Sequence, residues 1–221
     1  MPLIIGITGS IATGKSVACE TITALGAVHC DADKLVHRLY DPGKPAFDRI
    51  IAVFGKEVIG EDGYIDRKVL GAKVFGKPDE MRKLTSAIGD IAVAVKAVIN
   101  DWNATLGQND VALLEAVNLI EAGYGQWCHR VWLFACEDDL ALNRLMERNQ
   151  MSEGDAKQRL ASQRSWQERE PAADLLLFND GDLDDFRIRV EGEFTSTRDL
   201  WLSSELPPSR YFMWWEARFE G

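Results

Sequence analysis

The sequence is poor in the residues from which disulfide frameworks and structural metal sites are built. It has four cysteines and three histidines in 221 residues, and no two cysteines form a Cys-x-x-Cys pair. Scattered cysteines of this kind are typical of reduced, buried thiols in a cytosolic protein. His29, His37 and His129 show no ligand spacing, so we predict no zinc site.

The chain is also short of positive charge and of long apolar runs. Its 25 lysines and arginines are outnumbered by 35 acidic residues, which gives a net charge of −10. Nucleic acid and anionic membranes attract basic surfaces, so we expect neither as a partner. No apolar run approaches the ~18 residues of a membrane span. The N-terminus enters an apolar run almost at once, so we expect no signal peptide and a cytoplasmic protein.

Short apolar segments alternate with helical patterns along the chain. A length of 221 residues suits one α/β domain with insertions. Five segments have the character of buried parallel strands: residues 3–8, 27–30, 111–115, 131–135 and 175–178. Alternation of such strands with helices predicts a three-layer α/β fold around a parallel five-stranded sheet.

Residues 9–16 read GSIATGKS and match the pattern G-x-x-x-x-G-K-[ST] between the first apolar run and a predicted helix at 15–25. This order of strand, loop and helix identifies a phosphate-binding P-loop. Gly9 and Gly14 permit backbone angles that let several N–H groups face one anion. Lys15 adds a charge for the β- and γ-phosphates, and Ser16 adds a hydroxyl for Mg²⁺. The sequence therefore predicts nucleoside triphosphate binding, with the Lys15 ammonium facing solvent.

Two carboxylates, Asp31 and Asp33, stand at the end of the second predicted strand, which we expect to lie beside the P-loop. A general base at this place could accept the proton of an attacking hydroxyl. Alternatively, both residues cap the helix that follows, which is a common use of Asp. We assign Asp33 as the base and Asp31 as a capping or bracing residue, and the capping interpretation stays open for both.

Arginines gather in and just before a polar, helical stretch at residues 148–169. They are Arg144, Arg148, Arg159, Arg164 and Arg169. Because the guanidinium fork binds phosphate oxygens two at a time, such a group could form a lid over the triphosphate. The alternative is a solvated helix held by ion pairs between residues four apart, such as Glu153 with Lys157.

The motifs taken together resemble the dephospho-CoA kinase family, from residue 4 to about residue 186. In addition to the P-loop, the resemblance rests on segments that follow one another in the family's order. They are Asp31-Ala32-Asp33-Lys34, PGKPA at 42–46, DGYIDR at 62–67, RLASQ at 159–163, Ala173-Asp174 and NDG at 179–181. The resemblance implies ATP-dependent phosphorylation of the ribose 3′-hydroxyl of dephospho-CoA. The products are coenzyme A and ADP, in the final step of coenzyme A biosynthesis.

The resemblance also implies roles for individual residues. Lys15, Asp33 and Arg144 are the expected catalytic residues, and Ser16 is the expected Mg²⁺ ligand. The residues expected to bind ATP are Gly9, Ile11, Ala12, Thr13, Gly14, Lys15, Ser16, Val17, Arg148 and Asn179. ATP and dephospho-CoA are the expected partners, and the working form is expected to be a monomer or a small homo-oligomer.

The resemblance divides the chain into a kinase domain at 1–198 and an aromatic tail at 199–221. Within the domain we predict a core (1–33, 105–147 and 171–198), a helical substrate-binding insertion (34–104) and the lid (148–170). The tail contains Trp201, Tyr211, Phe212, Trp214 and Trp215. Aromatic residues at this density should not stay in water, so the tail docks on its own domain or contacts another subunit.

The sequence departs from the usual family pattern at two places. Gly89-Asp90 replaces a usual His-Pro, and Glu115 begins a segment in which a usual Asp and a Pro are missing while Glu121 is kept. Two alternatives therefore stay open. One is a P-loop kinase that acts on another small hydroxyl substrate, such as a nucleotide or a sugar. The other is a nucleotide-binding relative that is catalytically impaired.

Overall fold

The structure, a computed structural model, describes residues 1–218 and divides into two compact units. The first unit joins Met1–Asp31 to Val98–Gly221, and the second is Ala32–Ala97. Residues 219–221 of the predicted tail lie outside the described range. The second unit begins two residues before the predicted insertion and ends inside a helix, α6 (Ile91–Thr105). The assignment of functional domains stays a prediction.

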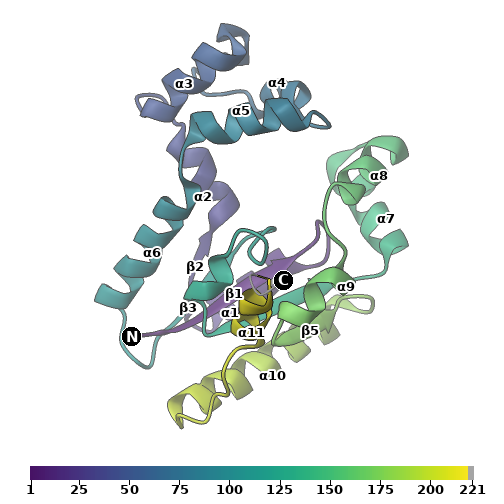
Figure 1. Ribbon diagram of the computed structural model, residues 1–221. Coiled ribbons are helices and arrows are strands. Elements are labelled where there is room, and N and C mark those ends of the chain that lie inside the picture. Colours follow the sequence, from purple (N-terminus) through teal and green to yellow (C-terminus); the bar gives the residue numbers. More distant parts are fainter. Residues whose placement is uncertain (219–221) are drawn as a thin grey trace. The chain divides into compact units, whose positions relative to one another are not determined.

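A parallel five-stranded sheet forms the centre of the first unit, as predicted (Figure 1). Its strands are β1 (Leu3–Gly9), β2 (Val28–Asp31), β3 (Val111–Glu115), β4 (Arg130–Ala135) and β5 (Leu175–Phe178). They lie in the order β2-β3-β1-β4-β5, and all four neighbouring pairs are parallel. Each strand agrees with its predicted segment to within one residue at either end.

Strand β1 is buried along its whole length because helices cover the sheet. Its alternate residues Leu3, Ile5 and Ile7 belong to a core shared with α1 (Lys15–Ala24) and α10 (Leu183–Leu202). On the opposite face Gly6 leaves no room for a side chain, because a Cβ there would crowd Leu119 and Cys128. Each fully buried Leu or Ile contributes about 1.5–3 kcal/mol, so this core accounts for much of the unit's stability.

The first unit also contains several further helices. They are η2 (Tyr124–Trp127), α7 (Asp138–Asn149), α8 (Glu153–Ala161), α9 (Trp166–Arg169), η3 (Glu170–Ala172) and α11 (Arg210–Ala217). Several helices begin at capping side chains: Ser165 and Glu168 form a capping box at α9, and Asp182 caps α10. Within residues 1–218, none of the helices has the length and apolar character needed to cross a membrane.

The second unit is helical, in keeping with the weak strand signal of its sequence. It contains α2 (Ala32–Leu39), α3 (Pro45–Phe54), η1 (Lys56–Val58), α4 (Arg67–Val74), α5 (Pro78–Ile88) and the start of α6. Its own core includes Ile50, Phe54, Val58, Leu70 and Val74. The unit therefore has a hydrophobic centre of its own.

The aromatic tail docks on the first unit through helix α11. Ser209 caps this helix, and its hydroxyl donates to a carboxylate oxygen of Asp174 at 2.7 Å. Tyr211 is fully buried, and its hydroxyl donates to the carbonyl oxygen of Ile120 at 3.0 Å. The Tyr211 ring lies so close to Gly125 that a Cβ at this glycine would clash with it. The tail thus follows the first of its two interpretations, docking on its own domain.

Replacement of Tyr211 by Phe should destabilise the protein, because the carbonyl of Ile120 loses one of its two hydrogen bonds and keeps only that from the Gly123 amide at 3.3 Å. The net loss of one buried hydrogen bond costs about 0.5–1.5 kcal/mol, and we expect the free energy of unfolding to fall by that amount in urea titrations. Phe212→Ala is the matched control, because Phe212 lies on the same helix and is 43% exposed. It should change stability by no more than about 0.5 kcal/mol. Equal losses in both variants would contradict the docked position of α11.

Candidate functional site

The loop at residues 9–16 connects the carboxyl end of β1 to helix α1, in the order that the sequence predicts. Gly9 and Gly14 have φ angles of 147° and 98°, which side-chain-bearing residues rarely adopt. A Cβ at Gly9 would clash with the carbonyl oxygen of Phe134, and one at Gly14 would clash with the Asn179 side chain. The two glycines are therefore required both by backbone conformation and by the close packing around the loop.

Lys15 does not face solvent, contrary to the expectation from the sequence. It is 7% exposed, and its ammonium donates to the carbonyl oxygens of Gly9 at 2.9 Å and Ser10 at 2.8 Å. A buried ammonium needs such acceptors, since its desolvation is otherwise costly. The charge thus lies inside the loop, next to the positive end of α1, where an anion is favoured.

Asn179 stands directly after β5 and supports the loop from behind. Its side-chain amide donates to the carbonyl oxygen of Thr13 at 3.4 Å. Its Oδ1 is buried and has no hydrogen-bond partner among the described residues. Because the carboxyl ends of parallel strands share one edge of the sheet, a residue 170 positions from Gly9 in the chain reaches the same loop. This buried oxygen beside the loop is therefore available to accept a hydrogen bond.

The other residues predicted to bind ATP occupy the loop and the first turn of α1. Ser16 is exposed there, Val17 is half-buried, and the Ile11 amide donates to the side chain of Gln163 at 2.9 Å. A glycine cradle, an adjacent ammonium and an exposed hydroxyl on the first helical turn fit a triphosphate with Mg²⁺. Of these residues, Ser16 has the oxygen that Mg²⁺ requires.

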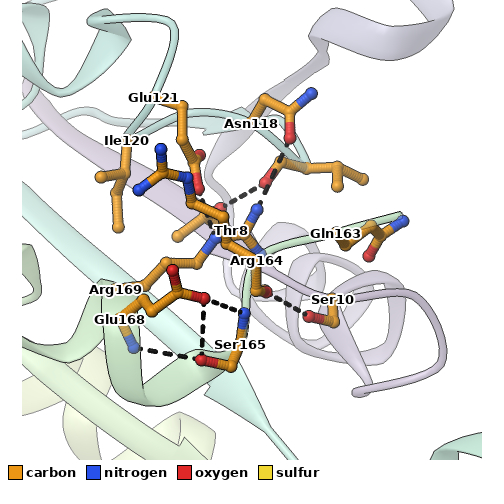
Figure 2. Close-up of polar contacts among 12 residues, drawn as sticks. Thr8, Ser10, Asn118, Ile120, Glu121, Gln163, Arg164, Ser165, Glu168 and Arg169 are labelled. Atoms are coloured by element: carbon orange, nitrogen blue, oxygen red, sulfur yellow. Dashed lines mark hydrogen bonds and ion pairs between the residues drawn. The ribbon is translucent and has the colours of Figure 1, made fainter. Parts of the chain in front are cut away.

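The predicted lid contacts the loop in two places, and Arg144, just before the lid, contacts it in a third. In addition to the contact from Gln163, the hydroxyl of Ser10 donates to the carbonyl oxygen of Arg164 at 3.3 Å (Figure 2). Arg144 of α7 donates to the carbonyl oxygen of Ala12 at 3.4 Å. Arg148, one turn further along α7, is exposed. The lid thus begins within reach of the phosphate cradle.

Arg169 is a correction to the predicted group of lid arginines. It is 1% exposed, and its Nε donates to Glu121 Oε1 at 2.7 Å, while its Nη2 lies 3.5 Å from Asn118 Oδ1. Figure 2 shows these side chains converging beside Thr8. A buried, ion-paired arginine cannot close over the triphosphate. Instead it ties the end of the lid to the segment that follows β3.

The two aspartates near β2 belong to different units. Asp31 is the last residue of β2 and pairs in register with Glu115 of β3. Asp33 is exposed in the first turn of α2, in the helical unit. The assignment of Asp33 as the catalytic base stays a prediction.

The fold also brings together three residues that no sequence pattern connected, Cys19, His29 and Glu115. His29 Nε2 lies 3.1 Å from Glu115 Oε2. Burial, and to a smaller extent the Glu115 carboxylate, raises the pKa of the Cys19 thiol. The three residues come from α1, β2 and β3, so no linear spacing marks them. The sequence indicated only that the strands of His29 and Glu115 belong to one sheet.

Replacement of Arg169 by Met should leave Glu121 without its cation. Breaking a buried pair costs about 3–5 kcal/mol, and we expect the lower end because the Glu121 side chain is 21% exposed. The double variant Arg169→Met with Glu121→Leu should recover much of the loss in thermal or urea unfolding. The control is Arg164→Met, at an exposed arginine of the same segment, which should be nearly neutral. No recovery in the double variant would show that packing, and not charge pairing, holds Arg169.

Comparisons with known proteins agree with this geometry. A sequence model of the dephospho-CoA kinase family matches residues 3–185. A dephospho-CoA kinase of Streptococcus pyogenes serotype M3 is 33% identical over 194 residues, which cover 88% of this chain and 98% of the relative. A dephospho-CoA kinase from Campylobacter jejuni matches with a TM-score of 0.66 and 26% identity, over 90% of this chain and 98% of its own. A crystal structure from Thermus thermophilus, 24% identical, shares the fold with a TM-score of 0.71, over 88% of this chain and 97% of its own.

Proposed function

The chain belongs to the dephospho-CoA kinase family, and we propose that it transfers the γ-phosphoryl group of ATP to the ribose 3′-hydroxyl of dephospho-CoA. The products are coenzyme A and ADP, in the final step of coenzyme A biosynthesis. The observation that carries the proposal is the P-loop, with Lys15 inside it and Asn179 behind it. We place this activity in the cytoplasm, in a monomer or small homo-oligomer.

In this proposal the Lys15 ammonium changes its hydrogen-bond acceptors when ATP binds. The ammonium leaves the carbonyl oxygens of Gly9 and Ser10 for the oxygens of the β- and γ-phosphates. Charged acceptors bind an ammonium more strongly than neutral carbonyls do, which makes the exchange favourable. Mg²⁺, held by Ser16, would neutralise charge on the same phosphates when bound.

The acceptor side of the reaction is assigned to Asp33 and the helical unit. Asp33 takes the proton from the ribose 3′-hydroxyl as its oxygen attacks the γ-phosphorus, and the leaving group is ADP. Arg144, next to the loop at Ala12, stabilises negative charge on the phosphoryl oxygens during transfer. Arg148 binds the ATP phosphates from the following turn of α7. Positioning and charge stabilisation then account for most of the rate, as in phosphoryl transfer generally.

The departure at Gly89-Asp90 has a structural use that does not require a different acceptor. Gly89 ends α5 with a φ of 97°, and a carboxylate oxygen of Asp90 accepts from the amides of Ala92 and Val93 at 2.9 and 3.3 Å. The pair thus ends one helix and caps the next. The departure therefore gives no reason to assign a different acceptor.

Measurement of ADP release tests the proposal directly. With ATP and Mg²⁺, dephospho-CoA should be phosphorylated far faster than nucleosides or sugars in the same assay. Lys15→Met keeps the aliphatic stem and removes the charge, so turnover should fall by about 10²-fold or more. The melting temperature of this variant serves as the control, because Lys15 also braces the loop. If the protein phosphorylates another acceptor faster, that acceptor and not dephospho-CoA is its substrate. If the Lys15→Met variant folds and keeps its turnover, the proposed role of Lys15 is refuted.

Asp33→Asn keeps the shape of the side chain but cannot accept the ribose proton. Since a positioned base contributes ~10²–10⁴-fold, the turnover number should fall by that order while ATP affinity changes little. Asp31→Asn is the matched control and should lower stability by ~0.5–2 kcal/mol with little effect on chemistry. A larger kinetic loss at Asp31 would reverse the two assignments. Equal and small losses would mean that transfer proceeds without a side-chain base.

A further inference from the structure

A thiol, an imidazole and a carboxylate converge at the edge of the sheet next to the P-loop helix. They belong to Cys19 of α1, His29 of β2 and Glu115 of β3, all within the first unit. One possible ligand atom from each residue lies within 4.8 Å of those of the other two. Contrary to the expectation of no zinc site, which rested on linear spacing alone, we propose that these three residues bind a divalent transition-metal ion of the Zn²⁺ class.

The donor set decides the class of ion. Zn²⁺ takes thiolate, imidazole and carboxylate ligands at about 2.0–2.3 Å, so tetrahedral ligand atoms stand about 3.3–3.8 Å apart. His29 Nε2 and Glu115 Oε2 are 3.1 Å apart, and all three atoms lie within 4.8 Å of one another, so side-chain movements of about 1 Å bring them to this spacing. Mg²⁺ and Ca²⁺ prefer oxygen-only sites, so a sulfur and a nitrogen ligand exclude them here.

The elements that carry the ligands are held firmly. β2 and β3 are paired in register, with His29 opposite Leu113 and Asp31 opposite Glu115. Cys19 belongs to the core that packs α1 against the sheet, and Glu115 is buried. A metal site is strongest where rigid elements, not loops, place its ligands. Only small side-chain movements are then required for binding.

His29 provides the route by which an ion reaches the other two ligands. Its side chain is 25% exposed on the edge strand, while the side chains of Cys19 and Glu115 face inward. With three protein ligands, the fourth position belongs to water, as in open zinc sites. Binding releases the Cys19 thiol proton to solvent, and the resulting thiolate and the Glu115 carboxylate balance the two charges of the ion.

The location gives the site a consequence for α1. Cys19 lies one helical turn after Lys15, so the two side chains share a face of α1. A bound ion would fasten this helix to β2 and β3 and thereby stabilise the end of the P-loop. The inference does not depend on the identity of the acceptor substrate.

Direct titration of the full-length protein tests the site. The reduced, metal-free protein is titrated with Zn²⁺ against a chromophoric chelator in the absence of ATP, and separately with Co²⁺ as a spectroscopic substitute. We expect one Zn²⁺ per chain, a cobalt–thiolate charge-transfer absorption and a higher melting temperature with Zn²⁺. The absorption should disappear in Cys19→Ala. Zn²⁺ affinity should fall by at least ~100-fold in His29→Gln, beyond the loss expected for a supporting contact.

Matched controls lie elsewhere in the chain. Cys30→Ala removes a thiol from the strand position next to His29, where the side chain points to the opposite face. His37→Gln removes an imidazole from the helical unit. Both should bind Zn²⁺ like the unmodified protein. His29→Gln changes a partly exposed residue, so it keeps the test valid even if Cys19→Ala fails to fold.

Three results would overturn the proposal. They are the absence of stoichiometric Zn²⁺ binding, a thiolate absorption that survives in Cys19→Ala, and unchanged affinity in His29→Gln. Any of them would leave the cluster as a hydrogen-bonded group in which His29 pairs with Glu115. Because ATP is absent from the titration, a negative result here would leave the proposed kinase activity untouched.

Discussion

The sharp turn between β1 and α1 is the constraint on which the rest of the first unit depends. β1 is the central strand and pairs with β3 on one side and β4 on the other, and Gly9 itself lies opposite Phe134 of β4. The loop that follows has no spare volume at Gly9 or Gly14. Since strand pairing and close packing both act on this loop, its backbone is held in place before any phosphate arrives, and the Lys15 ammonium is kept inside it by two carbonyl oxygens.

The segment after β3 connects parts of the chain that are far apart in sequence. Val117 accepts from the hydroxyl of Thr8 on β1, Ile120 accepts from Tyr211 of the tail, and Glu121 pairs with Arg169 at the end of the lid. P-loop strand, lid and tail are thus attached to one short stretch of backbone. The buried Arg169 pair is the most demanding of these contacts, because a charge left alone there would be strongly unfavourable.

Much of the fold was predictable because its signals are local. Five apolar runs with helical patterns between them predict the parallel sheet, since strands buried on both faces are apolar throughout. No helix boundary was predicted within the insertion at 34–104, although Gly89 stands where α5 ends. Its effect depends on a positive φ that the glycine permits but does not enforce. The tail's aromatic composition indicated burial but could not identify the surface that covers it.

In the candidate site, too, some features could be predicted from the sequence and others could not. The P-loop could be identified from the residues alone, because residue types at fixed spacing between a strand and a helix specify a phosphate cradle. Three contacts appear only in the folded chain: Lys15 is buried against two carbonyls, Arg169 pairs with Glu121, and Cys19, His29 and Glu115 lie together. These contacts join residues from separate elements through the order and register of the strands. The spacing of residues along the chain does not predict such contacts, because they form only when the sheet has formed.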